Sequence, residues 1–192
     1  MGPDALARVF DRGMAASSDF DLNPGSVMPE GRVLRAAGVL VGVLDGRVIL
    51  TKRSSRLKHH PGQIAFPGGK VDPGDTGPEA AALRETQEEI GLSPLQVQVL
   101  GHLPLHETIT GFAVTPVLAH VTGPFTPISE PGEVDEVFTV PLSYLADPSS
   151  YRIEGRVWRG EWRRYYAVPY GPYYIWGATA RILRGLAERL IR

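Results

Sequence analysis

Three glutamates near the middle of the chain are spaced so that they could act together on one ion. Glu85 and Glu88 are three residues apart, and Glu85 and Glu89 are four apart, so on a helix all three carboxylates project from one face. Like charges that close repel one another, whereas a divalent cation reverses the sign of the interaction. Carboxylate oxygens suit Mg²⁺ or Mn²⁺. By itself, such a triple is more often a solvated acidic face, because Glu is a good helix former.

A glycine turn precedes the acidic segment. Phe66-Pro67-Gly68-Gly69 places two glycines where a backbone can approach a ligand closely or adopt positive φ, and a carbonyl in such a turn can bind a metal. Either half alone is commonplace: the turn is typical of ordinary tight turns, and Arg84 is typical of surface ion pairs. A glycine turn followed by Arg-Glu-x-x-Glu-Glu-x-Gly is a far more specific pattern.

A basic segment stands just upstream, between residues 49 and 69. It contains six basic or titratable side chains: Lys52, Arg53, Arg56, Lys58, His59 and His60. Cations beside a metal site are well placed to hold substrate phosphates, although a solvated basic loop has the same composition. No further ligand stands at a spacing that would make the histidine pair a metal site.

Apolar patterning predicts the elements that carry these segments. Residues 35–44 predict a buried strand, Asp45-Gly46 a hairpin turn, and residues 47–51 the returning strand. Residues 78–90 predict a helix. Further strands are predicted at 95–103, 112–121, 137–140 and in a hairpin within 151–168, and further helices at 4–16 and 175–191. Mixed strands with few helices predict the α+β class.

The ends of the predicted helix over residues 78–90 carry their own signals. Thr76 and Glu79 form a plausible capping box, Pro78 suits the first turn, and Gly91 suits the stop. Residues 123–136 form a Pro/Gly/Glu-rich loop before the next strand.

Composition bounds the class of protein. The chain has 192 residues, 43% of them apolar and 21% charged, which suits one compact domain over 1–192, with 1–34 as an N-terminal extension. A net charge of −1 gives no global field for nucleic acid, so we expect a small-molecule substrate. The absence of cysteine excludes disulfides and thiolate sites and fits a cytoplasmic location. No membrane association is expected, since no apolar run of about 18 residues exists. The oligomeric state stays open.

Together, the glycine turn and the acidic segment resemble the Nudix box, written G-x5-E-x7-R-E-U-x-E-E-x-G-U with U apolar. Gly69 opens it, and Thr86 stands at the first U position. If counting starts at Gly69, Asp75 replaces the box Glu and the segment is one residue longer; counting back from Arg84 puts that Glu at Thr76. The second half is matched by Arg84, Glu85, Glu88, Glu89, Gly91 and Leu92.

The upstream segment resembles the signature of the coenzyme A pyrophosphatase branch of the Nudix hydrolases, L-L-T-x-R-[SA]-x3-R-x3-G-x3-F-P-G-G. Ile49 replaces the first Leu. Lys58 stands at the second Arg, which keeps the charge but loses bidentate geometry, and Arg56 is close enough in sequence to compensate. The positions that match in register are Leu50, Thr51, Arg53, Ser54, Gly62, Phe66, Pro67, Gly68 and Gly69.

These resemblances imply the Nudix fold, an α/β/α sandwich with a mixed sheet between helices, and a Nudix box over about residues 69–92. They imply metal-dependent hydrolysis of the pyrophosphate bond of coenzyme A (CoA) or a derivative, giving 4′-phosphopantetheine and adenosine 3′,5′-bisphosphate. Two alternatives are a Nudix pyrophosphatase for ADP-ribose or another nucleoside diphosphate derivative, and a non-catalytic nucleotide-binding module. Intact box glutamates argue against the latter.

The resemblance also implies roles for individual residues. Glu85 and Glu89 are expected to be the main ligands of Mg²⁺ or Mn²⁺, with Glu88 as a third ligand or base and the Gly69 carbonyl as a further ligand. Arg84 is expected to orient the glutamates. Glu133, in the loop before a strand, is the candidate base or additional ligand, and an acidic surface loop is the alternative. Substrate binding is assigned to Gly68, Arg53, Arg56 and Lys58, the last three as candidates for the 3′-phosphate.

Overall fold

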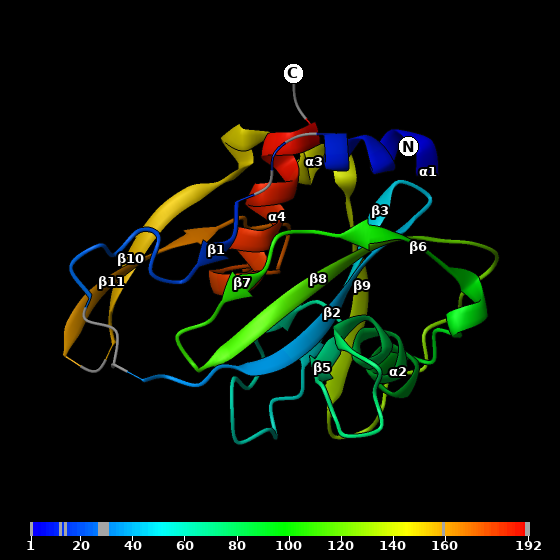
Figure 1. The fold of residues 1–192 in the computed structure, drawn as a ribbon, viewed down its shortest axis with the longest axis horizontal. Coiled ribbons are helices and arrows are strands. Elements are labelled where there is room, and N and C mark those ends of the chain that lie inside the picture. The colour runs from blue at the N-terminus through cyan, green and yellow to red at the C-terminus, as the bar shows by residue number, and fades with distance from the viewer. Residues whose placement is uncertain (1, 12, 14, 27–30, 159, 191–192) are drawn as a thin grey trace.

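A computed structural model gives the fold and describes residues 2–11, 13, 15–26, 31–158 and 160–190. Strands fill the middle of the chain, and the longest helix follows them (Figure 1). In the described part, no helix combines the length and apolar character needed to cross a bilayer. In chain order the elements are α1 (Pro3–Ala7), η1 (Arg8–Asp11), β1 (Ser17–Ser18), β2 (Arg35–Leu44), β3 (Arg47–Arg53), β4 (Ile64–Ala65), β5 (Gly68–Lys70), α2 (Pro78–Ile90), η2 (Pro94–Gln96), β6 (Val97–His102), β7 (His106–Glu107), β8 (Phe112–Val121), β9 (Val134–Pro141), α3 (Leu142–Leu145), η3 (Pro148–Ser150), β10 (Arg152–Trp158), β11 (Glu161–Ala167) and α4 (Gly177–Leu190).

Strands β2, β3 and β8 form the centre of a mixed sheet. β2 runs parallel to β8, with Arg35 opposite Phe112, and turns through Asp45 and Gly46 into antiparallel β3. Both turn residues have positive φ, as a tight two-residue hairpin requires. β3 pairs with β9, and β8 pairs with β6 and β7. β2 is thus an inner strand and mostly buried, which explains its nearly continuous apolar sequence.

β2 and β3 pair beside their hairpin turn and then diverge. Their paired residues are Val43 with Val48 and Leu44 with Arg47, whereas farther along β5 pairs with β2 and β4 pairs with β3. Residues 64–70 therefore bridge the fork between the two strands. The predicted glycine turn lies within this bridge, so it is part of the sheet instead of a free loop.

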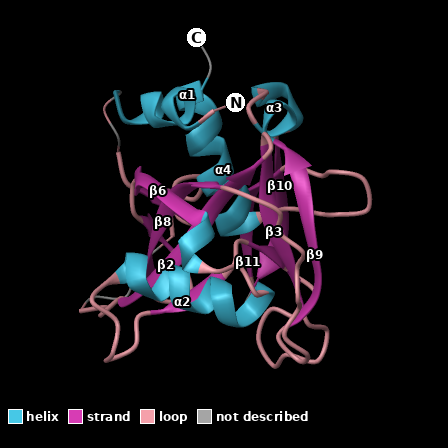
Figure 2. Ribbon diagram, turned by 90° about the vertical axis from the view of Figure 1, so that its right-hand side faces the viewer, coloured by secondary structure: helices cyan, strands magenta, loops and turns pink. Residues whose placement is uncertain are grey.

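The sheet buries apolar side chains on both faces, which confirms the predicted α+β sandwich. On one face, Leu40, Ile49 and Val117 pack with Ala82 and Ile90 of α2. The next residue of each strand belongs to the core on the opposite face, because side chains alternate along a strand. That core includes Val41, Leu50, Leu118, and Leu183 and Leu186 of α4. Both views place α1, α3 and the termini at one end of the sheet and α2 toward the other (Figures 1 and 2).

The predicted helix over residues 78–90 is confirmed as α2. It stops at Gly91, whose φ of 74° is left-handed, as a glycine after a helix permits. The predicted capping box is wrong, because Gly77 occupies the N-cap and no side chain caps the helix. Thr76 is thus one position too early, and Glu79 instead forms a hydrogen bond with His102 Nε2 at 2.7 Å.

The predicted strand over residues 112–121 is confirmed as β8, in spite of its proline. On one side of β8, the pairing with β6 ends at Val117 and the pairing with β7 begins at Val114. Pro116 lies between these two pairings, and its carbonyl accepts the Leu103 N–H at 2.9 Å. The missing N–H of proline therefore falls in a gap of the ladder on this side.

The helix predicted over residues 4–16 is shorter than expected. It consists of α1 followed by the 3-10 turn η1, which ends at Asp11. Leu6 and Val9 are buried in the core, so the apolar spacing was correctly interpreted there. Met14, the last apolar residue of the predicted pattern, lies outside the described residues.

A buried histidine ties the N-terminal segment to the sheet. His106 of β7 is fully buried and forms hydrogen bonds with Ser17 Oγ at 2.9 Å and Asp19 Oδ1 at 3.1 Å. These are the residue types of a hydrolytic triad, but the second oxygen of Asp19 accepts the Ile109 N–H at 2.8 Å. With the histidine inaccessible and the carboxylate bonded to backbone, the set serves as a structural link that satisfies buried polar groups.

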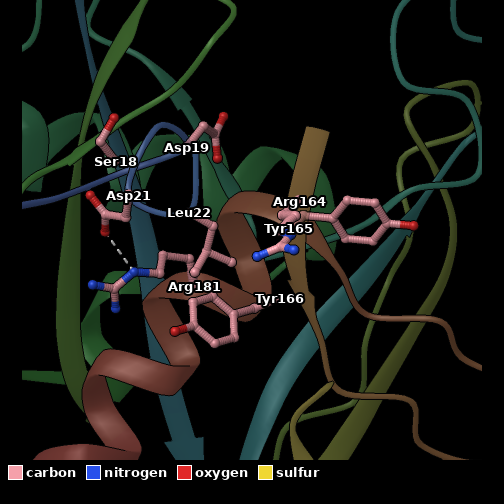
Figure 3. Close-up of a pocket in the computed structure, with 9 residues that line it drawn as sticks. Ser18, Asp19, Asp21, Leu22, Arg164, Tyr165, Tyr166 and Arg181 are labelled. Atoms are coloured by element: carbon pink, nitrogen blue, oxygen red, sulfur yellow. Dashed lines mark hydrogen bonds and ion pairs between the residues drawn. The ribbon is translucent and has the colours of Figure 1, made fainter. Parts of the chain in front are cut away.

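A small pocket lies where this N-terminal segment meets α4 and β11. Asp21 accepts a hydrogen bond from Arg181 Nε at 2.8 Å, and the Arg181 guanidinium lies 5.8 Å from the centre of the Tyr166 ring (Figure 3). The pocket has a volume of about 20 Å³. That space suits a water molecule and no organic substrate.

Candidate functional site

The glycine turn lies directly against the acidic helix. Gly68 N–H donates to Glu89 Oε2 at 3.0 Å. A Cβ atom on residue 69 would lie 2.5 Å from Glu85 Cδ, which is closer than two such carbons can approach. Glycine at position 69 therefore allows the Glu85 carboxylate to rest on the backbone. The two halves of the sequence pattern are in contact in the fold.

Arg84 joins the loop of the pattern to its helix. Its Nε and Nη2 donate to Oδ1 and Oδ2 of Asp75, both at 3.0 Å, in the bidentate geometry that guanidinium and carboxylate favour. Its Nη1 donates to Glu85 Oε1 at 3.0 Å and Glu88 Oε2 at 3.1 Å. The hydrogen bonds from Arg84 hold the pKa of Asp75 below its ordinary value. Asp75, and not Thr76, thus connects the loop to the helix.

Glu89 is the buried carboxylate of the group. Its residue is 5% exposed, and burial raises its pKa to about 7, with a further rise from the charges of Glu85 and Glu133. The Gly68 N–H and the positive charge of Arg53 oppose this rise. Gly68, Arg53, Glu85 and Glu133 therefore all lie close enough to affect the pKa of Glu89. The charge of Glu89 is unfavourable in this setting, and a neighbouring cation would favour it.

The loop that carries Glu133 is attached to the end of α2. The Glu130 N–H donates to the Glu89 carbonyl at 2.9 Å, which is one of the carbonyls left unpaired at a helix end. The Glu133 carbonyl accepts the Ser54 N–H at 2.8 Å. Glu133 is thus held between α2 and the residue that follows β3, and its side chain is exposed.

The basic segment separates into two parts. Arg53 ends β3, and its charge acts on both Glu89 and His60; the pKa of His60 is lowered first by burial and then by Arg53. Arg53 is therefore near enough to act on both Glu89 and His60. Arg56 and Lys58 lie exposed on the loop after β3. Of the three predicted phosphate ligands, the structure brings Arg53 beside the acidic group.

Comparison with known proteins matches residues 33–158 to the family described as the NUDIX domain. The chain belongs to the Nudix family. It is 41% identical over 159 residues to a protein named as an uncharacterized Nudix hydrolase, NudL, of Citrobacter koseri, and 39% identical to that of Escherichia coli O7:K1. Each match covers 81% of this chain and 83% of the relative. The crystal structure of a MutT/nudix family protein from Enterococcus faecalis shares the fold, with a TM-score of 0.51 and 15% identity, over 86% of this chain and 65% of that chain.

The Nudix box of the chain extends from β5 to the residues just after α2. Since Asp75 pairs with Arg84, the longer spacing counted from Gly69 describes its loop. Thr86, at a position the box gives to an apolar residue, is 1% exposed. Its Oγ1 has no hydrogen-bond partner among the described residues. The position is buried as the box requires, with a hydroxyl in place of a methyl group.

Nudix hydrolases generally use divalent cations such as Mg²⁺ or Mn²⁺, and the donor set of this box fits such an ion. Glu85, Glu88 and Glu89 offer hard carboxylate oxygens, and residue 69 leaves the Glu85 carboxylate room against the backbone. In the arrangement described, Arg84 pairs with Glu85 and Glu88. Within the described ranges, no three His, Asp or Glu side chains form a ready-made metal cluster. Arg84 contacts one oxygen of Glu85 and one of Glu88, so the second oxygen of each carboxylate is left for a cation.

Replacing Gly69 by Ala is expected to lower kcat/KM by about 100-fold while changing the free energy of unfolding by less than about 1 kcal/mol. The added methyl group meets the end of the Glu85 side chain, which can swing away at little cost in stability. The Glu85 carboxylate is then displaced from the backbone of residue 69. A displacement near 1 Å is enough to slow strongly a reaction that depends on positioned groups. Steady-state kinetics and urea unfolding measure the two effects.

Gly74→Ala is the matched control for this substitution, because Gly74 belongs to the same loop and a Cβ there meets nothing within 4 Å. It is expected to leave both quantities nearly unchanged. Equal losses of kcat/KM in the two variants would show that activity depends on the flexibility of the loop and not on the position of the Glu85 carboxylate.

One glycine important to the site could not be identified from the sequence. A Cβ on residue 38 of β2 would lie 1.7 Å from the carbonyl oxygen of Pro78, so Gly38 lets the first turn of α2 rest on the strand. The strand contains a second glycine, Gly42, whose Cβ would meet only side chains, at 3.3 Å. Nothing in the sequence distinguishes the two glycines.

Proposed function

We propose that this chain hydrolyses the diphosphate of CoA or a CoA derivative with the help of a divalent cation. The products would be 4′-phosphopantetheine and adenosine 3′,5′-bisphosphate. Family membership supports a hydrolase of the Nudix type. The resemblance of residues 49–69 to the CoA-branch signature supports the choice of substrate.

The observation that carries this proposal is the position of residues 49–69, the segment that resembles the CoA-branch signature, beside the Nudix box. Arg53 exchanges backbone hydrogen bonds with the far end of its own loop, donating to Gln63 at 3.0 Å and accepting from Gly62 at 3.1 Å. Ser54 is buried and bonded to Glu133. The segment is thus hydrogen-bonded to the loop of Glu133, and the charge of Arg53, which acts on Glu89, is available to an anionic diphosphate.

The carboxylates of the box would hold the cation. Glu85 and Glu89 are its main ligands in this proposal, with Glu88 and the Gly69 carbonyl as further ligands. A cation held by these residues would supply neutralisation of the charge that develops on the diphosphate oxygens. Arg84 acts as a positioning residue, because its fork sets the directions of Glu85 and Glu88.

Hydrolysis requires a proton acceptor near the attacking water. The water oxygen forms a bond with one phosphorus, the bridging phosphorus–oxygen bond breaks, and the water proton passes to a base. We assign this base to Glu133, because its loop is bonded to the end of α2 and its charge acts on Glu89. Its exposed side chain is accessible to water and substrate, and Glu88 is the alternative.

Product analysis tests the proposal. The protein is incubated with CoA, ADP-ribose, NADH and dGTP, each with Mg²⁺ or Mn²⁺, and the products are separated and identified by mass. Release of 4′-phosphopantetheine from CoA is the expected result. Cleavage of another diphosphate without CoA would retain the Nudix chemistry and overturn the choice of substrate. No turnover of any substrate would favour the non-catalytic module.

A further inference from the structure

A large open pocket lies beside the end of β3, where Lys52 is part of its lining. Its volume is about 510 Å³, and it lies between residues 60–64, the segment 172–176 and β10. This volume falls in the range of small-molecule sites. The side chains that give it chemical character are Lys52, His60, Glu136, Arg156, Tyr174 and Trp176.

Lys52 and Arg156 are the cations of the pocket lining, and Glu136 lies opposite Lys52 where β3 pairs with β9. Within the part of the chain that the structure describes, neither Lys52 nor Arg156 forms an ion pair. Glu136, the acidic residue of the lining, accepts a hydrogen bond from the Tyr173 hydroxyl. Glu154, which neighbours Arg156 on β10, accepts one from the Tyr174 hydroxyl.

The guanidinium of Arg156 is held in place before any ligand arrives. Its Cζ lies 4.2 Å from the centre of the Trp176 ring, which is a cation–π contact. The Trp176 ring is itself packed edge-on against the Tyr165 ring, with 5.1 Å between the two ring centres. Because the planar guanidinium contacts the ring through its face, the N–H groups along its edge can still donate to an oxyanion.

The pocket adjoins the Nudix site through the backbone of β3. Lys52 lines the pocket, and its neighbour Arg53 acts on Glu89. The register of β3 with β9 shifts between these two residues, and the end of β3 thus brings one cation to the pocket and one to the acidic group. In a nucleotide with a 5′-diphosphate and a 3′-phosphate, one ribose carries both anions. Two cationic sites on adjacent residues suit such a substrate.

We propose that Arg156 and Lys52 bind a phosphomonoester on the ribose of the substrate, which in CoA is the 3′-phosphate. This inference rests on the proposed function and assigns a binding subsite to it. It differs from the expectation drawn from the sequence, which named Arg53, Arg56 and Lys58. Arg53 lies with the carboxylates, and Arg56 and Lys58 lie on the exposed loop.

Hydrolysis of CoA and dephospho-CoA, which differ only by the 3′-phosphate, tests the subsite. Arg156→Gln is expected to lower kcat/KM for CoA about tenfold, the cost of one lost charged hydrogen bond, and to leave dephospho-CoA within about twofold. Lys52→Met is expected to act in the same direction. Arg152→Gln, an exposed position on the same face of β10, is the matched control and should affect neither substrate. Equal losses on both substrates in Arg156→Gln would overturn the subsite.

A binding measurement separates this inference from the proposed function. Calorimetry with adenosine 3′,5′-bisphosphate and with AMP compares the affinities for nucleotides with and without the 3′-phosphate. Tighter binding of the bisphosphate, lost in Arg156→Gln, supports the subsite even if the protein cuts a different diphosphate. Equal affinities would overturn the subsite, and CoA hydrolysis in the same protein would leave the proposed function standing.

Discussion

Glu89→Gln is expected to lower kcat/KM by on the order of 10²–10³-fold with either Mg²⁺ or Mn²⁺. The substitution keeps the shape of the side chain and one acceptor oxygen for the Gly68 N–H. It removes the charge of the carboxylate that is buried beside Arg53, Glu85 and Glu133. A neutral amide is a poor ligand for a divalent cation in comparison with a carboxylate. Steady-state kinetics at saturating metal measure the loss.

Glu79→Gln provides the control on the same helix. Glu79 lies in the first turn of α2 and pairs with His102 at the surface, away from the carboxylate group. Its activity is expected to remain within about twofold of the original, because surface pairs contribute little. Full activity of Glu89→Gln would remove Glu89 from the set of metal ligands.

The Glu89→Gln variant is expected to be more stable than the original protein at pH 8 when a chelator removes divalent cations. The pKa of Glu89 is about 7 in the folded protein against an ordinary 4.5, so between these values the folded state holds a proton that the unfolded state has lost. Stability therefore falls as pH rises from about 4.5 to 7, by up to about 3 kcal/mol. Glutamine carries no such proton.

Urea unfolding at pH 5 and pH 8 in the presence of a chelator measures this difference. The variant and the original protein should differ less at pH 5 than at pH 8, and adding Mg²⁺ at pH 8 should stabilise the original protein more than the variant. A difference that does not change with pH would contradict the raised pKa of Glu89.

Gly38→Ala is expected to destabilise the fold by more than about 3 kcal/mol or to prevent folding. The new methyl group would lie 1.7 Å from the carbonyl oxygen of Pro78 and 2.6 Å from its carbonyl carbon. Both atoms belong to backbone, so relief requires α2 to move away from β2. Since α2 carries the box glutamates, any folded fraction should also lose activity. Urea unfolding and circular dichroism measure the change.

Gly42→Ala in the same strand separates this contact from a general effect of glycine. A Cβ on residue 42 would meet side-chain atoms of Leu40 and Val121, both at 3.3 Å, and these can shift by a few tenths of an ångström. The cost is expected to stay below about 1.5 kcal/mol. Similar losses in both variants would show that the approach of α2 to β2 does not limit stability.

Local patterns in the sequence predicted several elements correctly. The strands over 35–44 and 112–121 and the helix over 78–90 have the predicted bounds, because apolar periodicity and a terminal glycine act within a few residues. The resemblance to the Nudix family is confirmed by the match of residues 33–158 to that family. The capping box failed because two positions, Thr76 and Gly77, are adjacent candidates for one N-cap.

The sequence could name the residue types of the site, since a helix repeat alone brings Glu85, Glu88 and Glu89 to one face. It could not predict which of the three carboxylates is buried. Burial of Glu89 depends on the bridge of residues 64–70 across the fork between β2 and β3. Such burial arises from contacts between segments distant in sequence, and no local pattern records it.

The partners of the charged groups were likewise a matter of tertiary structure. Spacing left Asp75 and Thr76 as alternative candidates for the box position, and the fold pairs Asp75 with Arg84. Composition treated Arg53, Arg56 and Lys58 as one basic cluster, whereas the end of β3 brings the charge of Arg53 to Glu89, and Arg56 and Lys58 lie on the exposed loop. Local backbone geometry follows from neighbouring residues, but electrostatic pairing follows from distances in space, which only the packed sheet and helix define.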